Sequence, residues 1–216
     1  IDSKCKSFVT QVTPLAYRLN QNEKELIKTK EAKSVALLPG SRKSEIALLA
    51  DEMIRTAKKL KNIDSSYKFY MPLSDKGHLD LINEPFEDWV EVSFNNSQEV
   101  LSKCQIGIIT SGTATLEALL LRTPCVTLYK TNWLSYRIIK PLLSIENFSL
   151  PNLLSGNTFL PELLQDEVNS ENIIESLNVI NSKGMDYYYK EFHKIHENLK
   201  AGSSETAANE ISNLID

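Results

Sequence analysis

The sequence predicts an α/β fold, a parallel sheet flanked by helices, and three observations carry this prediction. Short apolar runs such as Val35–Leu38 and Ile106–Ile109 have the length of buried strands. They alternate with segments of helical periodicity such as Ser44–Lys61, and the connections are short. Strands that alternate with helices in this way build a parallel sheet with right-handed crossovers. We therefore expect one half of a doubly wound architecture.

The first elements follow from apolar spacing. Val35–Leu38 is the first strand, and Ser44–Lys61 is a helix because its apolar residues recur at helical intervals. Tyr67–Met71 is the next strand, and we expect Pro72 to end it because proline lacks an N–H donor. A helix around Lys76–Ile82 follows.

Trp89–Val92 is the next short strand. Asn96 and Glu99 have the spacing of a capping box, which predicts a helix over Ser97–Cys104. Beyond it we expect a central strand, a helix, a turn and another strand, at Ile106–Ile109, Thr113–Leu121, Arg122–Pro124 and Cys125–Leu128.

After Tyr129 the alternation stops. Pro151, Gly156 and Pro161 predict ordered loops with short helical turns over Ser149–Gln165. The helices expected in this part of the chain are Trp133–Leu143, ended near Pro141, and then Ser170–Ile180, Met185–Leu199 and Ser203–Ile215.

The composition is that of an ordinary soluble globular protein, with 216 residues, 42% apolar and 24% charged. A formal net charge of -4 provides no general attraction for nucleic acid or for an anionic membrane surface. Cys5, Cys104 and Cys125 show no CxxC spacing, which favours a reducing compartment, with Cys104 and Cys125 as small core residues.

The start of the chain has no core pattern of its own. Residues 1–30 are polar and begin with Ile1, which suggests a piece of a longer protein cut near an interdomain connection. No secretory signal and no apolar run of membrane-spanning length is present in the sequence. We expect residues 1–30 to be that connection, 31–184 one domain, and 185–216 C-terminal helices that pack on a missing domain.

Two loops predict an anion site. Pro39–Arg42 and Thr110–Thr113 each follow a buried strand and lead into a helix. The first turn of a helix presents unpaired N–H groups with the positive end of the dipole behind them, which suits phosphate. Parallel strands carry both loops to one edge of the sheet, so a nucleotide or sugar nucleotide is the expected ligand. Neither GxGxxG nor GxxxxGK[ST] is present.

Arg42 and Glu117 are the charged candidates at these loops. An arginine beside a helix start suits bidentate phosphate binding, although a surface ion pair with Glu45 explains it too. Glu117 can accept hydrogen bonds from ribose hydroxyls, whereas the alternative is a carboxylate favoured by the helix dipole. If Thr113 caps the helix, Glu117 is one place past the position that a capping box needs. Ser111, Gly112 and Thr113 offer backbone access and hydroxyl groups.

Other polar groups favour structural explanations. His193 and His196 are three residues apart beside Glu197, but catalytic zinc needs three ligands, so a solvated helix face is preferred and no metal is expected. His78 stands alone in a turn, and no histidine is expected beside the two loops. An aromatic and basic cluster suits either lipid head groups or an amphipathic helix packed on the sheet: Trp133, Tyr136, Arg137 and Lys140.

Four motifs in order resemble the C-terminal half of the lipid-A-disaccharide synthase family. They are LLPGSR with Glu45 at Leu37–Arg42, TSGTATLE at Thr110–Glu117, LPNLLSG at Leu150–Gly156 and PELLQ at Pro161–Gln165. The resemblance runs from about Val35 to the end of the chain.

This resemblance implies one half of a GT-B glycosyltransferase, with Rossmann-like domains and the active site in the cleft between them. It implies an inverting transfer of 2,3-diacylglucosamine from its UDP donor to 2,3-diacylglucosamine 1-phosphate, giving lipid A disaccharide 1-phosphate and UDP, with no metal or cofactor. It further implies a cytoplasmic enzyme, peripheral at the inner membrane of a Gram-negative bacterium, whose missing N-terminal domain supplies the acceptor site and general base.

The same resemblance implies roles for individual residues. Arg42 would neutralise the diphosphate, and Glu117 would hold the ribose. Asn152 would lie near the diphosphate or sugar, with Glu162 and Gln165 facing the donor sugar. Ser111, Gly112 and Thr113 would line the phosphate and ribose region.

The chain departs from the family at its start and lacks a clear base. The family usually carries Gly-His-Pro-Leu on entry to this domain, where this chain has Thr10–Leu15 without the Gly-His. An inverting transfer needs a general base, and none is evident here. The chain alone is therefore expected to be inactive. The alternatives are another GT-B enzyme of UDP-GlcNAc, such as an epimerase or the lipid II-forming transferase, or a non-catalytic nucleotide-sugar binding module.

Overall fold

A six-stranded parallel sheet forms the centre of the protein, in the order β3-β2-β1-β4-β5-β6. The computed structural model describes residues 15, 19, 22–85, 87–132 and 147–199. The strands are β1 Glu31–Leu38, β2 Lys68–Leu73, β3 Val90–Phe94, β4 Cys104–Thr110, β5 Cys125–Tyr129 and β6 Glu162–Leu164. The α-helices are α3 Glu23–Lys28, α4 Lys43–Ile63, α5 Ser97–Lys103, α6 Thr113–Leu120, α8 Leu150–Ser155, α9 Ser170–Lys183 and α10 Met185–Leu199, with 3₁₀ turns η1 Lys76–Leu81 and η3 Gln165–Glu167.

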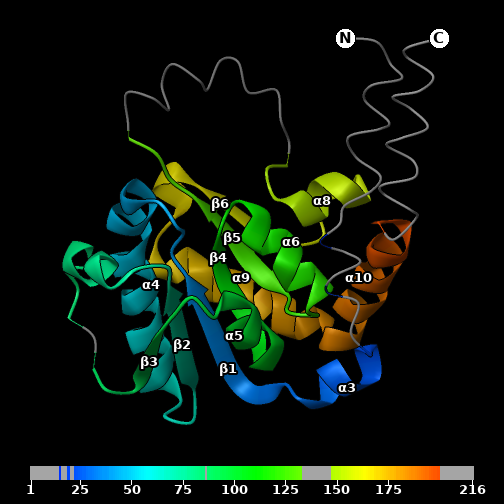
Figure 1. Ribbon diagram of the computed structural model, residues 1–216, viewed down its shortest axis with the longest axis horizontal. Helices are drawn as coiled ribbons and strands as arrows, with labels where there is room; N and C mark the ends of the chain where they lie inside the picture. The colour runs from blue at the N-terminus through cyan, green and yellow to red at the C-terminus, as the bar shows by residue number, and fades with distance from the viewer. Residues whose placement is uncertain (1–14, 16–18, 20–21, 86, 133–146, 200–216) are drawn as a thin grey trace.

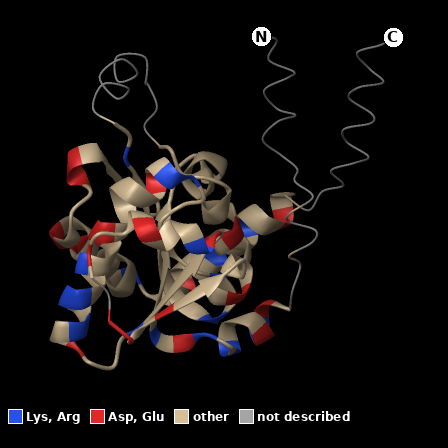
Figure 2. Cartoon of the chain, turned by 60° about the vertical axis from the view of Figure 1, so that its left-hand side comes forward, with Lys and Arg blue, Asp and Glu red and all other residues tan. Residues whose placement is uncertain are grey.

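Helices cover both faces of this sheet. Figure 1 shows α5 and α6 on one face, with α4 and α9 on the other. β1 and β4 lie in the middle and are buried along most of their length, as expected of strands covered on both sides. The predicted parallel sheet flanked by helices is thus confirmed. Acidic and basic residues are interspersed along the ribbon in the view of Figure 2.

Three details of the sequence prediction were wrong. Pro72 does not end β2 but lies inside it, because the described ladder to β1 ends at Tyr70 and Pro72 is aligned with β3. β6 was missed within a segment expected to be loops and short turns. The predicted capping box of α5 does not form, because the Asn96 side chain accepts from the Ser93 hydroxyl at 2.7 Å instead of capping the helix.

The remaining predicted elements agree within a few residues wherever the structure describes the chain. The predicted helices at Trp133–Leu143 and Ser203–Ile215, the aromatic and basic cluster, Cys5 and most of Thr10–Leu15 lie outside the described residues. Cys104 and Cys125 are fully buried, as predicted, and burial raises the pKa of each thiol to about 12. No helix among the described residues is both long enough and apolar enough to span a bilayer.

The C-terminal helix α10 belongs to the same core as the sheet. Tyr188 and Phe192 are fully buried. The Phe192 ring meets Phe159 edge-on, with the centroids 5.9 Å apart. One apolar stripe of α10 therefore completes the packing around α6, α8 and α9.

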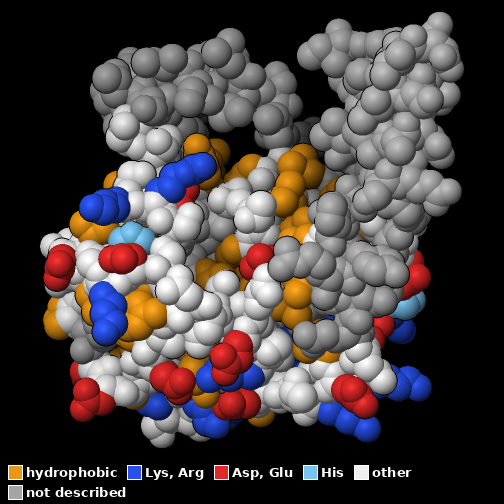
Figure 3. All heavy atoms as spheres, in the orientation of Figure 1, with side chains coloured by type: hydrophobic (Ala, Val, Ile, Leu, Met, Phe, Trp, Pro, Cys, Tyr) orange, Lys and Arg blue, Asp and Glu red, His pale blue; other side chains and the backbone are white. Residues whose placement is uncertain are grey.

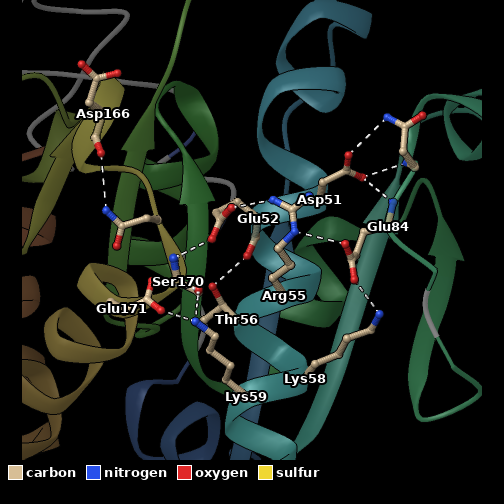
Figure 4. A network of polar contacts seen from close by, with 12 residues as sticks. Asp51, Glu52, Arg55, Thr56, Lys58, Lys59, Glu84, Asp166, Ser170 and Glu171 are labelled. Carbon is tan, nitrogen blue, oxygen red and sulfur yellow. Dashed lines mark hydrogen bonds and ion pairs between the residues drawn. The ribbon is translucent and has the colours of Figure 1, made fainter.

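Charged side chains of α4 hold this helix against its neighbours (Figure 4). Arg55 pairs with Glu52 at 2.9 Å and with Glu84 at 3.1 Å, in the loop after η1. Glu52 also accepts from the Ser170 N–H at 2.6 Å, at the first residue of α9. A carboxylate there is favoured by the positive end of the α9 dipole, so the network fixes how α4 and α9 meet.

Lys30 makes the stability of the fold depend on pH. Its ammonium donates to the Leu101 carbonyl and the Thr123 hydroxyl, each at 2.7 Å, and burial lowers its pKa from 10.5 to about 7. Between these values the unfolded chain binds a proton that the folded chain does not, so this group makes stability rise with pH above about 7. We expect Lys30→Met to flatten that rise in urea unfolding measured from pH 7 to 9, whereas exposed Lys28→Met leaves it intact. Parallel pH curves for wild type and Lys30→Met would contradict this assignment.

Candidate functional site

A cavity of about 590 Å³ opens at the carboxyl ends of four neighbouring strands. Residues from the loops after β1 and β4 line it, together with residues from the ends of β2 and β3: Gly40–Arg42, Thr110–Ala114, Pro72–Ser74 and Asn95–Ser97. Chain order reverses between β1 and β4 in the sheet, and open α/β sheets bind ligands at such switch points. The volume lies within the range of small-molecule sites. Figure 3 shows hydrophobic side chains in the middle of one face, with an acidic side chain among them.

The first loop is held by Glu45. Its carboxylate accepts from the backbone N–H groups of Ser41 and Arg42, each at 3.2 Å, and from the Arg42 guanidinium at 3.1 Å. Gly40 has φ of 107°, and a Cβ there would overlap that carboxylate, so the turn requires glycine. The loop thus has the geometry of an anion site, with the protein's own carboxylate occupying part of it.

Arg42 stands at the mouth of the cavity. It is the N-cap residue of α4, and 80% of its side chain is exposed. The predicted alternative, a surface pair with Glu45, is therefore present in the ligand-free protein. Such an exposed pair contributes little to stability, so the guanidinium can exchange Glu45 for a ligand phosphate at small cost.

The second loop opens α6 through Gly112. Gly112 is the N-cap residue, with φ of 155°, and Thr113 is the first helical residue. The helix therefore begins at Thr113, as predicted, and a cap at Thr113 is excluded because that cap would start the helix one residue later. The Thr115 hydroxyl turns back to the Gly112 carbonyl at 2.8 Å. Gly112 and Thr113 line the cavity, so the helix start faces it.

The Thr110 side chain provides independent evidence that a ligand binds at this loop. Its hydroxyl is buried and has no hydrogen-bond partner among the described residues, and Thr110 lines the cavity. Buried hydroxyl groups in native proteins are nearly always paired, with protein, water or ligand. The orphaned oxygen therefore marks a position where a polar partner belongs.

Glu117 lines the same cavity from the second turn of α6. With Gly112 as the cap, Glu117 is too far along the helix for a capping box, so that explanation is excluded. Its carboxylate accepts from the Gln98 side chain at 3.2 Å, which leaves acceptor capacity directed at the cavity.

Asn152, Glu162 and Gln165 do not line this cavity. Asn152 is a fully buried residue of α8, and its side-chain amide donates to Glu162 at 2.7 Å. Gln165 bridges to the backbone N–H and carbonyl of Thr131 at 2.7 and 3.1 Å. The structure thus brings five of the eight predicted residues together: Arg42, Ser111, Gly112, Thr113 and Glu117.

The three histidines differ in how well their predicted surroundings agree with the structure. His196 is buried, with Nδ1 3.2 Å from the Arg122 guanidinium, so the predicted solvated face was wrong for this residue, whereas His193 is exposed and pairs with Glu23 at 2.9 Å. His78 follows β2, and its Nδ1 lies 3.3 Å from the hydroxyl of Ser74, which lines the cavity. His78 is not among the residues that line the cavity, so the expectation that no histidine lies beside the two loops stays a prediction. The described residues contain no group of side chains suited to a metal ion.

Sequence reasoning missed several residues of the site. Ser74, Asn95 and Asn96 belong to the cavity wall, and so do Thr110 and Glu45, for which the motifs around them predicted no role of their own in the site. Glu45 could have been found, because it lies three residues after the cap and such a carboxylate often folds back onto the helix start. Asn95 and Asn96 follow a strand whose place beside β2 was not predicted, so nothing in the sequence placed them at this edge.

Comparison with known proteins identifies the family. The model of the lipid-A-disaccharide synthetase family matches residues 9–214. Lipid-A-disaccharide synthase of Idiomarina loihiensis is 31% identical over 94% of this chain and 55% of its own length. The corresponding proteins of Pseudoalteromonas translucida and Cupriavidus pinatubonensis are 35% and 32% identical over 89% and 84% of this chain. The chain spans about half the length of these relatives.

A solved structure agrees with the fold. The crystal structure of a GtfA/B complex superposes with a TM-score of 0.54, at 10% sequence identity, over 86% of this chain and 36% of that chain. This likeness and the sheet topology confirm the predicted fold, a Rossmann-like parallel sheet of the kind that forms one half of a GT-B glycosyltransferase. Because the family model covers nearly the whole chain, the chain belongs to the lipid-A-disaccharide synthetase family.

Proposed function

We propose that this chain is the donor-binding half of a lipid-A-disaccharide synthase. The observation that carries the proposal is the cavity at the strand ends, where two helix starts, Arg42 and the unpaired Thr110 hydroxyl converge. Helix-end N–H groups with an arginine suit a diphosphate, and an acidic residue nearby suits a ribose. The ligand we infer is UDP-2,3-diacylglucosamine, bound through its UDP moiety.

The reaction proposed for the whole enzyme is an inverting transfer. The 6-hydroxyl of 2,3-diacylglucosamine 1-phosphate attacks the anomeric carbon of the donor, and UDP leaves. Arg42 and the helix starts would stabilise the charge that develops on the leaving diphosphate, which is where preorganised donors contribute most. A general base must take the hydroxyl proton, and we assign it to the half that precedes this one.

The domain division and location are proposed on the same basis. Residues 1–30 would connect the two halves, 31–184 would bind the donor, and 185–216 would reach toward the other half. Because α10 buries Tyr188 and Phe192 on this half, contact with the other would use its exposed face or residues after Leu199. The substrates are lipids, so we infer a cytoplasmic enzyme peripheral to the inner membrane, with no nucleic-acid partner.

A turnover assay tests this division of labour. The purified chain, incubated with both lipid substrates in detergent, is expected to form no disaccharide detectable by mass spectrometry, because catalysis needs donor, acceptor and base held together. Supplying the preceding half in trans should restore some product. Turnover by the chain alone comparable to that of an intact enzyme would refute the assignment of the base to the other half. Donor binding without restored turnover would favour a binding module.

Glu117→Gln is expected to weaken UDP binding about tenfold while leaving the unfolding temperature of the ligand-free chain nearly unchanged. Glutamine keeps the size and one acceptor but loses the charge that strengthens hydrogen bonds to hydroxyl groups. The variant should also lose discrimination between UDP and 2′- or 3′-deoxy-UDP in calorimetric titrations. An equal loss of stability without ligand would indicate instead that Glu117 is structural, through its contact with Gln98.

A further inference from the structure

The Glu162 carboxylate accepts hydrogen bonds from the segment around the start of α8. Its Oε2 accepts from the Phe148 N–H at 2.8 Å. Its Oε1 accepts from the Ser149 N–H at 3.0 Å, the Ser149 hydroxyl at 2.6 Å and the Asn152 side-chain amide at 2.7 Å. Both carboxylate oxygens are therefore hydrogen-bonded to the protein. Glu162, the first residue of β6, thus fixes the backbone just before α8.

Asn152 has no capacity left for a ligand. Its Nδ2 donates to the Leu160 carbonyl at 2.9 Å as well as to Glu162, and its Oδ1 accepts from the N–H groups of Phe159 and Leu160 at 3.1 and 3.0 Å. These bonds use both amide protons and both lone pairs. Since Asn152 is also fully buried, its amide braces the Glu162 carboxylate, which means that it holds this carboxylate in place.

The backbone carbonyl of Phe148 connects this loop to the wall of the donor cavity. The Phe148 carbonyl accepts from the Ser111 hydroxyl at 3.1 Å, and the Ser111 N–H donates to the Leu128 carbonyl at 2.8 Å. Ser111 lines the cavity, beside the start of α6. One residue, Phe148, thus connects the Glu162 carboxylate to the anion-binding turn.

We infer that Glu162, braced by Asn152, is a positioning residue: it fixes the Phe148 backbone, which holds Ser111 in the wall of the donor cavity. This inference rests on the proposed function for the identity of the ligand. It differs from the role that the family resemblance implied for Glu162, a direct contact with the donor sugar.

The first test needs no ligand. Glu162→Gln keeps the shape of the side chain but replaces one carboxylate oxygen with an NH₂ group, which is a donor. The glutamine therefore cannot accept all four of the hydrogen bonds that Glu162 accepts. We expect faster amide exchange at Phe148 and Ser149, and shifted amide NMR signals at Ser111–Thr113. Glu175→Gln, at an exposed site on α9, is the control and should change neither. Faster exchange at Phe148 without any shift at Ser111–Thr113 would overturn the inference, because the effect would stop at the loop.

The second test is a double-mutant cycle on UDP affinity with Ser111→Ala. We expect Glu162→Gln to weaken UDP about tenfold, Glu162→Asp to recover part of the loss, and the double variant to bind no worse than the weaker single variant. UDP lacks the donor glucosamine, so unchanged UDP affinity in Glu162→Gln would overturn the inference in favour of a direct contact with that glucosamine. Additive losses would overturn it too. If the wild-type chain fails to bind UDP, the proposed function fails, while the exchange experiment still decides the positioning role.

Discussion

Arg42→Ala is expected to weaken UDP binding by about 1.5–3 kcal/mol, or roughly 10- to 150-fold in dissociation constant. The guanidinium is exposed at the mouth of the cavity and paired only with Glu45 among the described residues. On binding, it would exchange that carboxylate for the diphosphate, and hydrogen bonds between charged groups are the strong ones. Isothermal titration calorimetry at constant salt measures the change.

Lys43→Ala is the matched control for this prediction. It removes the same charge from the next residue, which is exposed but does not line the cavity. It should cost only the small, salt-dependent part of the attraction. Equal losses from Arg42→Ala and Lys43→Ala would show that Arg42 acts through general charge and not as a phosphate ligand.

Phe192→Ala is expected to lower the free energy of unfolding by about 3–5 kcal/mol, the usual cost of removing a buried aromatic ring. Phe192 is fully buried and packs on Phe159 and Tyr188, which joins α10 to the segment before β6. Urea unfolding monitored by circular dichroism gives the value.

The control for the core prediction lies on the opposite face of α10. Lys190→Ala replaces an exposed residue and should change stability by no more than about 0.5 kcal/mol. A loss below about 1 kcal/mol for Phe192→Ala would mean that α10 is not part of this core in solution.

The strongly periodic elements could be predicted from the sequence. α10 spans Met185–Leu199, the range predicted. Apolar residues at helical spacing form a stripe that is buried against the core only when the segment is helical. β1 and β4 were found because strands buried on both faces read as apolar runs. Each prediction depended on residues close together in the chain.

The elements that were missed depend on distant partners. β6 has three residues of intermediate burial, and only its pairing with β5 makes it a strand. Pro72 continues β2 because the described ladder to β1 has already ended at that point. His196 is buried in contact with Arg122, which lies far away in the sequence. Local patterns carry no information on such contacts.

The candidate site likewise has features that the sequence predicts and features that depend on distant contacts. The convergence of the loops after β1 and β4 could be predicted, because parallel strands share an edge. The direction of each side chain could not: Glu45 folds back over its loop, and Glu162 faces Phe148 instead of the cavity. The wall formed by Asn95 and Asn96 also depends on β3 pairing with β2.

Comparison of UDP with UMP in calorimetric titrations of the chain tests the central claim most directly. If the two helix starts and Arg42 bind a diphosphate, UDP should bind at least tenfold more tightly than UMP, a difference of about 1.4 kcal/mol or more. Arg42→Ala should remove most of that difference. Equal affinity for UDP and UMP, or a difference that survives in Arg42→Ala, would contradict the assignment of this cavity as the site of the donor diphosphate.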